Sequence, residues 1–238
     1  MGEQVDTGVA GARDGHSRRA FLTRAGAAGA AAALAQLPGF LASKGWLEQA
    51  LAAETDMTRD TINGLVAFVV PGPDAYSKAQ GESSKTPGAM AAKTTDAVIE
   101  LLDKFVGTSE GPTLPSAGGV ATLLNGFALQ VNPAAANGQF ASPFARLRFA
   151  EKIEVFRRFE SETEGSELRF VSGILVGAVG FLSHTEWGAY DFERRRLTSV
   201  PVGWRTSHYD GVAEGRAELK GYYQGRRSVR TMRRFRVG

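Results

Sequence analysis

Apolar residues recur at helical spacing along much of the chain after residue 57. Four of them share one face of the segment 58–70 at positions i, i+3, i+4 and i+7: Ile62, Leu65, Val66 and Val69. This spacing matches the 3.6-residue turn of an α-helix, and Pro71 cannot continue a helix because it lacks the backbone N–H. We therefore expect an amphipathic helix that begins near Thr58 or Asp60 and ends before Pro71.

Two further segments carry the same helical signal. In the first, Thr94 or Thr95 can act as the N-cap and Gly107 follows the last apolar position. The apolar positions of this segment fall on one face: Val98, Leu101, Leu102 and Phe105. The second segment, 119–131, precedes an Asn-Pro pair and carries apolar residues in helical register. Each segment predicts a helix.

A helix is also expected to begin at Ser142 and Pro143. Ser142 can cap it, and Pro143 occupies the first helical position, where proline is favoured. Its expected buried side chains are Phe149, Ile153 and Phe156. By contrast, residues 71–88 are dense in Pro, Gly and Ser and predict a long loop.

Residues 167–183 form the most apolar segment of the chain. The stretch 170–182 contains no charged residue, but its thirteen residues fall short of the ~20 needed to span a membrane. We therefore expect a central buried helix, in which Gly173 and Gly177 allow another helix to approach closely. With no strand alternation elsewhere, the pattern predicts an all-α fold: a single helical-bundle-like domain with long loops and an irregular C-terminal segment.

The N-terminal region has the layout of an export signal. Its motif resembles that of twin-arginine (Tat) signals and comprises Ser17, Arg18, Arg19, Phe21 and Leu22. A run without acidic residues follows, from Ala25 to Leu37. The alternative interpretation is an ordinary basic segment followed by an alanine-rich helix. The signal predicts that the Tat translocase exports the protein to the periplasm, the cell envelope or the extracellular space.

A small-residue match marks the expected cleavage site. It is Ala50-Leu51-Ala52, so the mature chain is expected to begin near Ala53. The expected organisation is a signal region over 1–52, a helical domain over 53–225 and a basic tail over 226–238.

Composition excludes several kinds of site. The 238 residues include no Cys and three His, which rules out disulfides and thiolate-bound clusters and argues against structural zinc. The net charge of +3 arises from the tail, which holds six arginines and no acid. Basic character therefore does not indicate a nucleic-acid partner. Arg226, Arg230 and Arg233 would share one helical face, suited to an acidic partner, unless the tail is simply solvated.

Motifs for catalysis and nucleotide binding are missing from the sequence. It has no G-x-S-x-G elbow, no G-x-G-x-x-G and no P-loop, so we assign no catalytic, cofactor-binding or metal-binding residue. Two histidines have carboxylates nearby in sequence and could act as general bases: His184, with Glu186 and Asp191, and His208, with Asp210. The acidic cluster 160–167 is interpreted as the solvated end of a helix.

The segment 199–223 combines aromatic residues with glycines. Such a segment suits a binding surface, because aromatic side chains offer large contact areas, but it could equally cover the core. The candidate interface residues here are Gly203, Trp204, Tyr209, Gly211, Tyr222 and Tyr223.

Three features together resemble the small subunit (subunit 3) family of gluconate 2-dehydrogenase. They are the Tat-like motif, the Pro71-Gly72-Pro73-Asp74 and Pro87-Gly88-Ala89 segments that flank the loop, and V-G-W-R-T-S-H-Y-D-G over 202–211. The resemblance implies a non-catalytic exported subunit. Its companion would be a flavin-dependent dehydrogenase of the glucose–methanol–choline type, which holds the FAD and often passes electrons to a cytochrome.

Two other functions stay open on the sequence. One is an independent secreted enzyme that uses His184 or His208 as a base. The other is a secreted helical protein that binds a small ligand.

Overall fold

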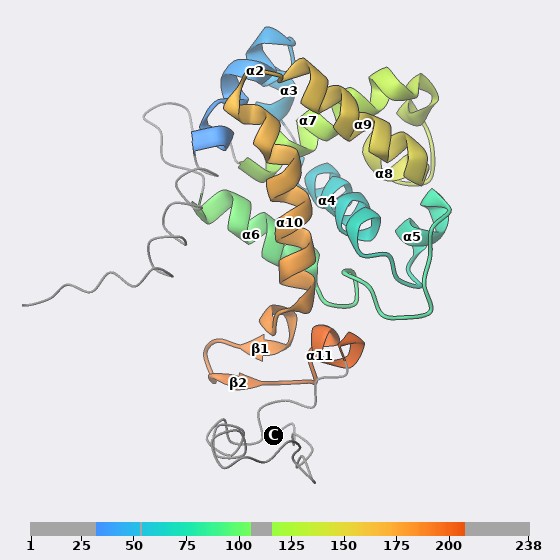
Figure 1. The fold of residues 1–238 in the computed structure, drawn as a ribbon, viewed down its shortest axis with the longest axis vertical. Coiled ribbons are helices and arrows are strands. Elements are labelled where there is room, and N and C mark those ends of the chain that lie inside the picture. The colour runs from blue at the N-terminus through green and yellow to red at the C-terminus, as the bar shows by residue number, and fades with distance from the viewer. Residues whose placement is uncertain (1–31, 53, 106–115, 208–238) are drawn as a thin grey trace, which may run out of the picture.

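The computed structural model describes residues 32–52, 54–105 and 116–207, and most of them are helical (Figure 1). The longer helices are α4 (Thr55–Val69), α6 (Thr94–Phe105), α7 (Ser116–Val131), α9 (Phe149–Glu162) and α10 (Phe170–His184). Shorter helices are α2 (Leu37–Ser43), α3 (Leu47–Leu51), α5 (Ala75–Gln80), α8 (Pro143–Arg146) and α11 (Val202–Thr206). The predicted all-α class is confirmed.

The few remaining elements are short. Single 3-10 turns are η1 (Pro133–Ala136), η2 (Glu167–Arg169) and η3 (Trp187–Ala189). Strands β1 (Tyr190–Asp191) and β2 (Arg196–Leu197) form an antiparallel hairpin in which Tyr190 pairs with Leu197. Within 71–88, predicted as a loop, the structure adds helix α5, because the Asp74 carboxylate caps it by accepting a hydrogen bond from the Ser77 N–H at 2.9 Å.

Helix α7 lies at the centre of the described fold. It packs against α2, α3, α4, α6, α8 and α9, and its buried residues lie on nearly every side. Small residues make this possible. At Gly126, an added Cβ would lie 2.6 Å from the Trp46 ring, so the glycine is required for the ring to pack there. Helix α4 has a comparable contact, since a Cβ on Gly64 would lie 2.8 Å from the Cα of Ala145.

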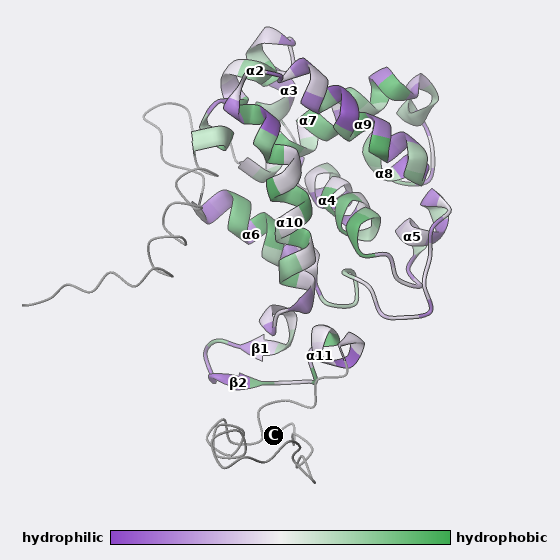
Figure 2. Ribbon diagram, in the orientation of Figure 1, coloured by the Kyte–Doolittle hydropathy of each residue, from purple (hydrophilic) through white to green (hydrophobic). Residues whose placement is uncertain are grey.

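The prediction that 167–183 is the central buried helix is wrong in its placement. Helix α10 lies at the surface, and only 39% of the run Glu167–His184 is buried. One face packs against α4, α6 and α9 through Val171, Leu175 and Val179. Figure 2 shows that α10 is hydrophobic along most of its length, as the sequence indicated. Overall hydrophobicity does not show how many faces of a helix are covered, and α10 is covered on one.

The helix expected from Ser142 onward is divided in two. Ser142 caps α8 as expected, accepting a hydrogen bond from the Ala145 N–H at 3.2 Å. Leu147 and Arg148 then adopt extended backbone angles, and a new helix, α9, begins at Phe149. The Glu151 carboxylate stabilises this second start by accepting a hydrogen bond from the Arg148 N–H at 2.7 Å.

Helices α2 and α3 come from the range 1–52 and pack into the same core as the rest of the domain. Leu37 and Leu41 are 1% and 0% exposed, and Ala50 is also buried. Phe40 stacks on Phe127, with ring centroids 6.3 Å apart. Described residues on both sides of the boundary expected at Ala53 thus belong to one hydrophobic core cluster.

Candidate functional sites

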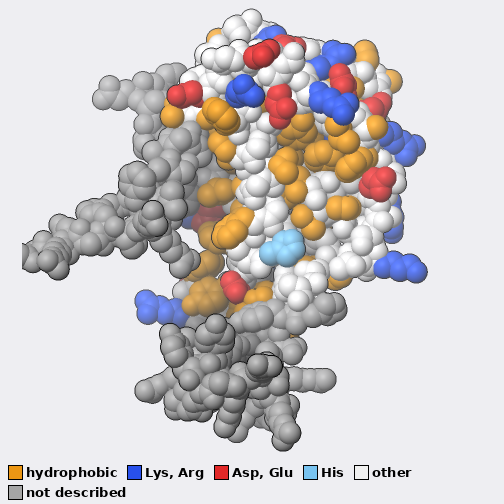
Figure 3. All heavy atoms as spheres, in the orientation of Figure 1, with side chains coloured by type: hydrophobic (Ala, Val, Ile, Leu, Met, Phe, Trp, Pro, Cys, Tyr) orange, Lys and Arg blue, Asp and Glu red, His pale blue; other side chains and the backbone are white. Residues whose placement is uncertain are grey.

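An apolar face of α10 is open to solvent. Phe170 and Phe181, near its two ends, are 61% and 72% exposed, and Val176 between them is 38% exposed. A Cβ added at Gly173, Gly177 or Gly180 would meet nothing within 4 Å. Figure 3 shows hydrophobic side chains and bare backbone over this helix. We call this surface, formed by Phe170, Gly173, Val176, Gly177, Gly180 and Phe181, the α10 face.

The α10 face contains no charged side chain, although a charged residue lies next to it. The helix carries no Asp, Glu, Lys or Arg between Phe170 and His184. Arg169 precedes it and places its guanidinium 5.8 Å from the Phe170 ring centroid. By length and composition alone, the run Glu167–His184 is also apolar enough to cross a membrane, a criterion that core helices of soluble proteins equally meet.

Two of the predicted interface residues lie at the C-terminal end of α10. Gly203 is buried directly against His184, where an added Cβ would lie 2.4 Å from the His184 carbonyl oxygen. The Trp204 Nε1–H donates a hydrogen bond to the Glu186 carboxylate at 3.0 Å. These contacts attach α11 to the end of α10.

Most of the other predicted site residues lie outside the described residues. They are the Tat motif residues Ser17, Arg18, Arg19, Phe21 and Leu22, the cleavage residue Ala53, and Tyr209, Gly211, Tyr222, Tyr223, Arg226, Arg230 and Arg233. His208 and Asp210 lie outside as well.

His184 contacts the backbone of its own helix. Its Nδ1 lies 2.8 Å from the Gly180 carbonyl oxygen. The two carboxylates nearby in sequence have other partners: Glu186 accepts from Trp204, and Asp191 accepts from the backbone N–H of Arg194 at 2.9 Å. The described contacts therefore do not pair His184 with a carboxylate that could orient it as a base.

The acidic cluster 160–167 links helices together. Glu160 accepts a hydrogen bond from Ser172 at 2.6 Å, Glu162 forms an ion pair with Lys44, and Glu167 accepts from Gln36 at 3.2 Å. Within 32–52, 54–105 and 116–207, no group of three His, Asp or Glu side chains is placed to hold a metal ion.

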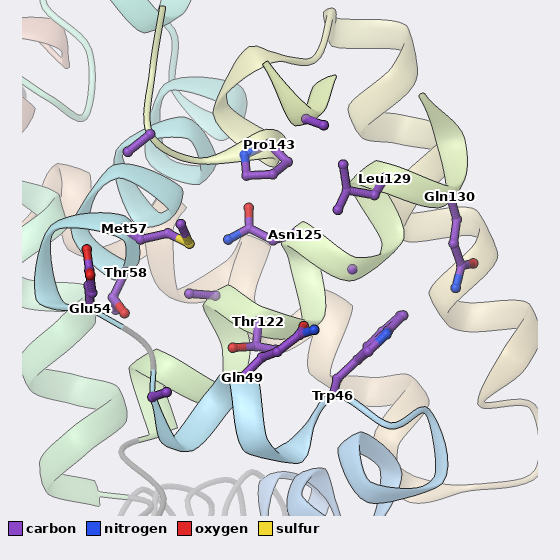
Figure 4. A pocket seen from close by; sticks show the side chains of 15 residues that line it. Trp46, Gln49, Glu54, Met57, Thr58, Thr122, Asn125, Leu129, Gln130 and Pro143 are labelled. Atoms are coloured by element: carbon purple, nitrogen blue, oxygen red, sulfur yellow. The ribbon is translucent and has the colours of Figure 1, made fainter. Parts of the chain in front are cut away.

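A cavity of about 760 Å³ lies on another part of the surface, between α3, α4, α7 and α8. Figure 4 shows Trp46 and Gln49 on one side, Pro143 on the opposite side and Asn125 between them. Apolar side chains, including those of Met57 and Leu129, make up much of the wall. A volume in this range suits a small organic ligand.

The orientation of Asn125 in the cavity follows from its hydrogen bonds. Its Oδ1 accepts from the Ser142 hydroxyl at 2.7 Å and from the Phe144 N–H at 3.1 Å. Its Nδ2 donates to Thr61 Oγ1 at 3.0 Å, and that hydroxyl in turn donates to the Met57 carbonyl. Asn125 thus holds α4, α7 and the start of α8 together beneath the cavity.

Lys152 is a buried cation that the sequence analysis did not single out. Its side chain is 0% exposed, and its Nζ donates to the Gly64 carbonyl at 3.1 Å and to Gln80 Oε1 at 2.9 Å. Burial lowers the pKa of Lys152 to about 7, and the negative charge of Asp74 opposes this shift in part. The sequence did contain an indication of this burial, because residue 152 falls on the apolar face of its helix, between Phe149 and Phe156.

Comparisons of the chain with protein-family models, with curated proteins and with solved structures found no match. The resemblance to the gluconate 2-dehydrogenase small subunit therefore rests on the sequence motifs alone.

Proposed function

We propose that this protein is a non-catalytic, Tat-exported small subunit that binds, stabilises and helps to export a partner. The partner is an FAD-dependent dehydrogenase of the glucose–methanol–choline type, which holds the cofactor and passes electrons onward, in some complexes to a cytochrome. The observation that carries the proposal is the α10 face. A contiguous exposed apolar patch on a folded domain favours an interaction site.

The composition of the α10 face favours a closely packed apolar partner. The exposed Phe170 and Phe181 offer two aromatic anchors, a residue type enriched in the cores of interfaces. Gly173 and Gly177 leave the helix backbone open between these anchors. Because the face carries no charge, it fits an uncharged helix or strand that can approach that backbone.

Export through the Tat route suits this division of labour. The Tat translocase carries folded proteins, so a subunit that bears the signal can accompany a partner already loaded with its cofactor. In this proposal the signal-bearing chain needs no cofactor of its own.

Gly177→Leu tests the docking role. Leucine has a high helix propensity and would enter open space, so the variant should be at least as stable as the wild type. Its side chain would nevertheless keep the partner away from the α10 backbone. We expect co-purification with a co-expressed FAD-dependent dehydrogenase of the same organism to fall by roughly tenfold or more, the equivalent of ~1.4 kcal/mol.

Gly39→Leu is the matched control. Gly39 lies in helix α2, and a Cβ there also meets nothing within 4 Å. This variant should co-purify like the wild type. Equal recovery of wild type and Gly177→Leu would count against docking through α10.

The cavity lined by Trp46, Asn125 and Pro143 supports a second candidate function, the binding of a small uncharged ligand. We expect a ligand of this class to raise the melting temperature of the isolated protein. Ala141→Phe, at an exposed residue of the cavity wall, should abolish that shift, whereas Ala134→Phe, exposed outside the wall, should not. A library of neutral compounds without any Ala141-dependent shift would exclude this function.

A further inference from the structure

We propose that residues 32–52 remain part of the protein after export, and that Ala50-Leu51-Ala52 is not a processing site. Any processing then falls before residue 32. The inference rests on the proposed function in that it assumes Tat export. Its structural basis is the packing of α2 and α3.

The apolar side chains of this segment form part of the hydrophobic core. Leu37, Leu41 and Ala50 are 1%, 0% and 2% exposed. Ala33 and Leu34, which lie in the apolar run of the export signal, are 1% and 4% exposed and belong to the same cluster. The second half of that run therefore also contributes side chains to the core.

Aromatic contacts join the segment to the central helix. The Trp46 ring packs edge-on against Phe127, with centroids 5.6 Å apart, and lies over Gly126. Phe40 contacts both Phe127 and Phe159. Loss of α2 and α3 would remove these contacts from Phe127, a side chain that is 0% exposed. A chain that began at residue 53 would thus leave the side of Phe127 that faces Phe40 and Trp46 without its packing partners.

Polar contacts link the segment to α9 and η2. Lys44 forms an ion pair with Glu162. Gln36 donates from its amide nitrogen to Glu167 at 3.2 Å, and its amide oxygen accepts from Ser166 at 2.9 Å. These partners lie in the part of the chain that precedes α10, so the segment is tied to the element that bears the proposed docking face.

Leu51, which is 51% exposed, and Ala52 lie at the surface, so what opposes cleavage here is the helical conformation before the predicted site. A protease needs an exposed segment that it can draw out of regular structure, and such segments are concentrated in loop tips and termini. Ala50 instead lies in helix α3, where its N–H donates to the Trp46 carbonyl at 3.0 Å. The Ala52 N–H likewise donates to the Glu48 carbonyl at 3.0 Å. Cleavage after Ala52 would require this helix to open first.

The mass and N-terminal sequence of the full-length chain recovered from outside the cytoplasm give the first test. We expect residues 32–52 to be present. We also expect the variant Ala52→Arg to have the same N-terminus as the wild type, although arginine at the last position of a signal prevents cleavage. An exported chain that begins at Ala53, or a longer chain in the Ala52→Arg variant alone, would overturn the inference.

A pair of full-length variants tests the same inference without export. Leu41→Ser places a hydroxyl in the core, whereas Ala42→Ser changes an exposed neighbour on the same helix. We expect Leu41→Ser to lower the melting temperature by roughly 10 °C and Ala42→Ser to leave it nearly unchanged. Equal melting temperatures would show that the segment is dispensable and would overturn the inference. Failure to export would contradict only the proposed function, since this pair is measured on purified protein.

Discussion

At the scale of single residues, Lys152 shows how burial changes ordinary chemistry. An exposed lysine is protonated at neutral pH, but Lys152 has only the neutral oxygens of Gly64 and Gln80 as hydrogen-bond acceptors. Among the described residues, no carboxylate accepts a hydrogen bond from its ammonium group, so burial favours the neutral amine. The consequence is a stability that depends on pH.

The pKa of Lys152 falls from 10.5 to about 7 on folding. Between these values the unfolded chain binds a proton that the folded chain does not, so the free energy of unfolding rises as the pH increases from about 7 to 10.5. Below about 7 both states are protonated, and Lys152 adds no further slope. Between pH 7 and 10.5, we expect the free energy of unfolding of the wild type to rise relative to that of Lys152→Met by about 5 kcal/mol, measured by urea unfolding.

Lys78→Met serves as the control for this measurement, because Lys78 is exposed. Its difference from the wild type should stay constant with pH. The same constant difference for Lys152→Met would contradict the assignment of the pH dependence to Lys152.

At the scale of elements, the helices differ in how closely their neighbours approach. Gly64 in α4 lies against the Ala145 backbone, whereas Gly173 in α10 faces open space. The amino-acid pattern alone does not distinguish these two glycines. Each occupies a helix, and only the packing shows which one is needed.

The same substitution should therefore have opposite effects in the two helices. Gly64→Ala would force α4 and α8 apart and is expected to lower the free energy of unfolding by about 1–3 kcal/mol. Gly173→Ala is expected to raise it by up to ~1 kcal/mol, because alanine has the better helix propensity. Chemical denaturation of both variants would check this, and a loss of stability for Gly173→Ala would indicate that its open face has been misjudged.

Helix positions could be predicted from the sequence more reliably than helix surroundings. The periodicity of Ile62, Leu65 and Val69 correctly indicated α4, and Ser142 was correctly identified as a cap. The break at Leu147 was missed, because the cap supplied by Glu151 looks like an ordinary charged side chain in sequence. The exposure of α10 was missed because the hydrophobicity of a helix does not show which of its faces pack against other helices.

At the scale of the whole molecule, the candidate sites depend on contacts between distant parts of the chain. The cavity is lined by Trp46, Asn125 and Pro143, which are far apart in the sequence. No local sequence motif predicts that these residues lie together. Lys152 likewise bonds to Gln80, which is 72 residues away. The sequence could supply the residues of these sites but not their proximity.

The packing of α2 also has a consequence for folding during synthesis, because its partners are made later than α2 itself. Lys44 and its partner Glu162 are 118 residues apart, so the ribosome needs about 6–24 s after making α2 to produce that partner. Until α7 and α9 have both been made, the apolar side chains of α2 lack the complete core against which they pack in the folded protein. Under the proposed export, a factor that recognises the apolar run 25–37 can contact its second half before α7 and α9 cover it.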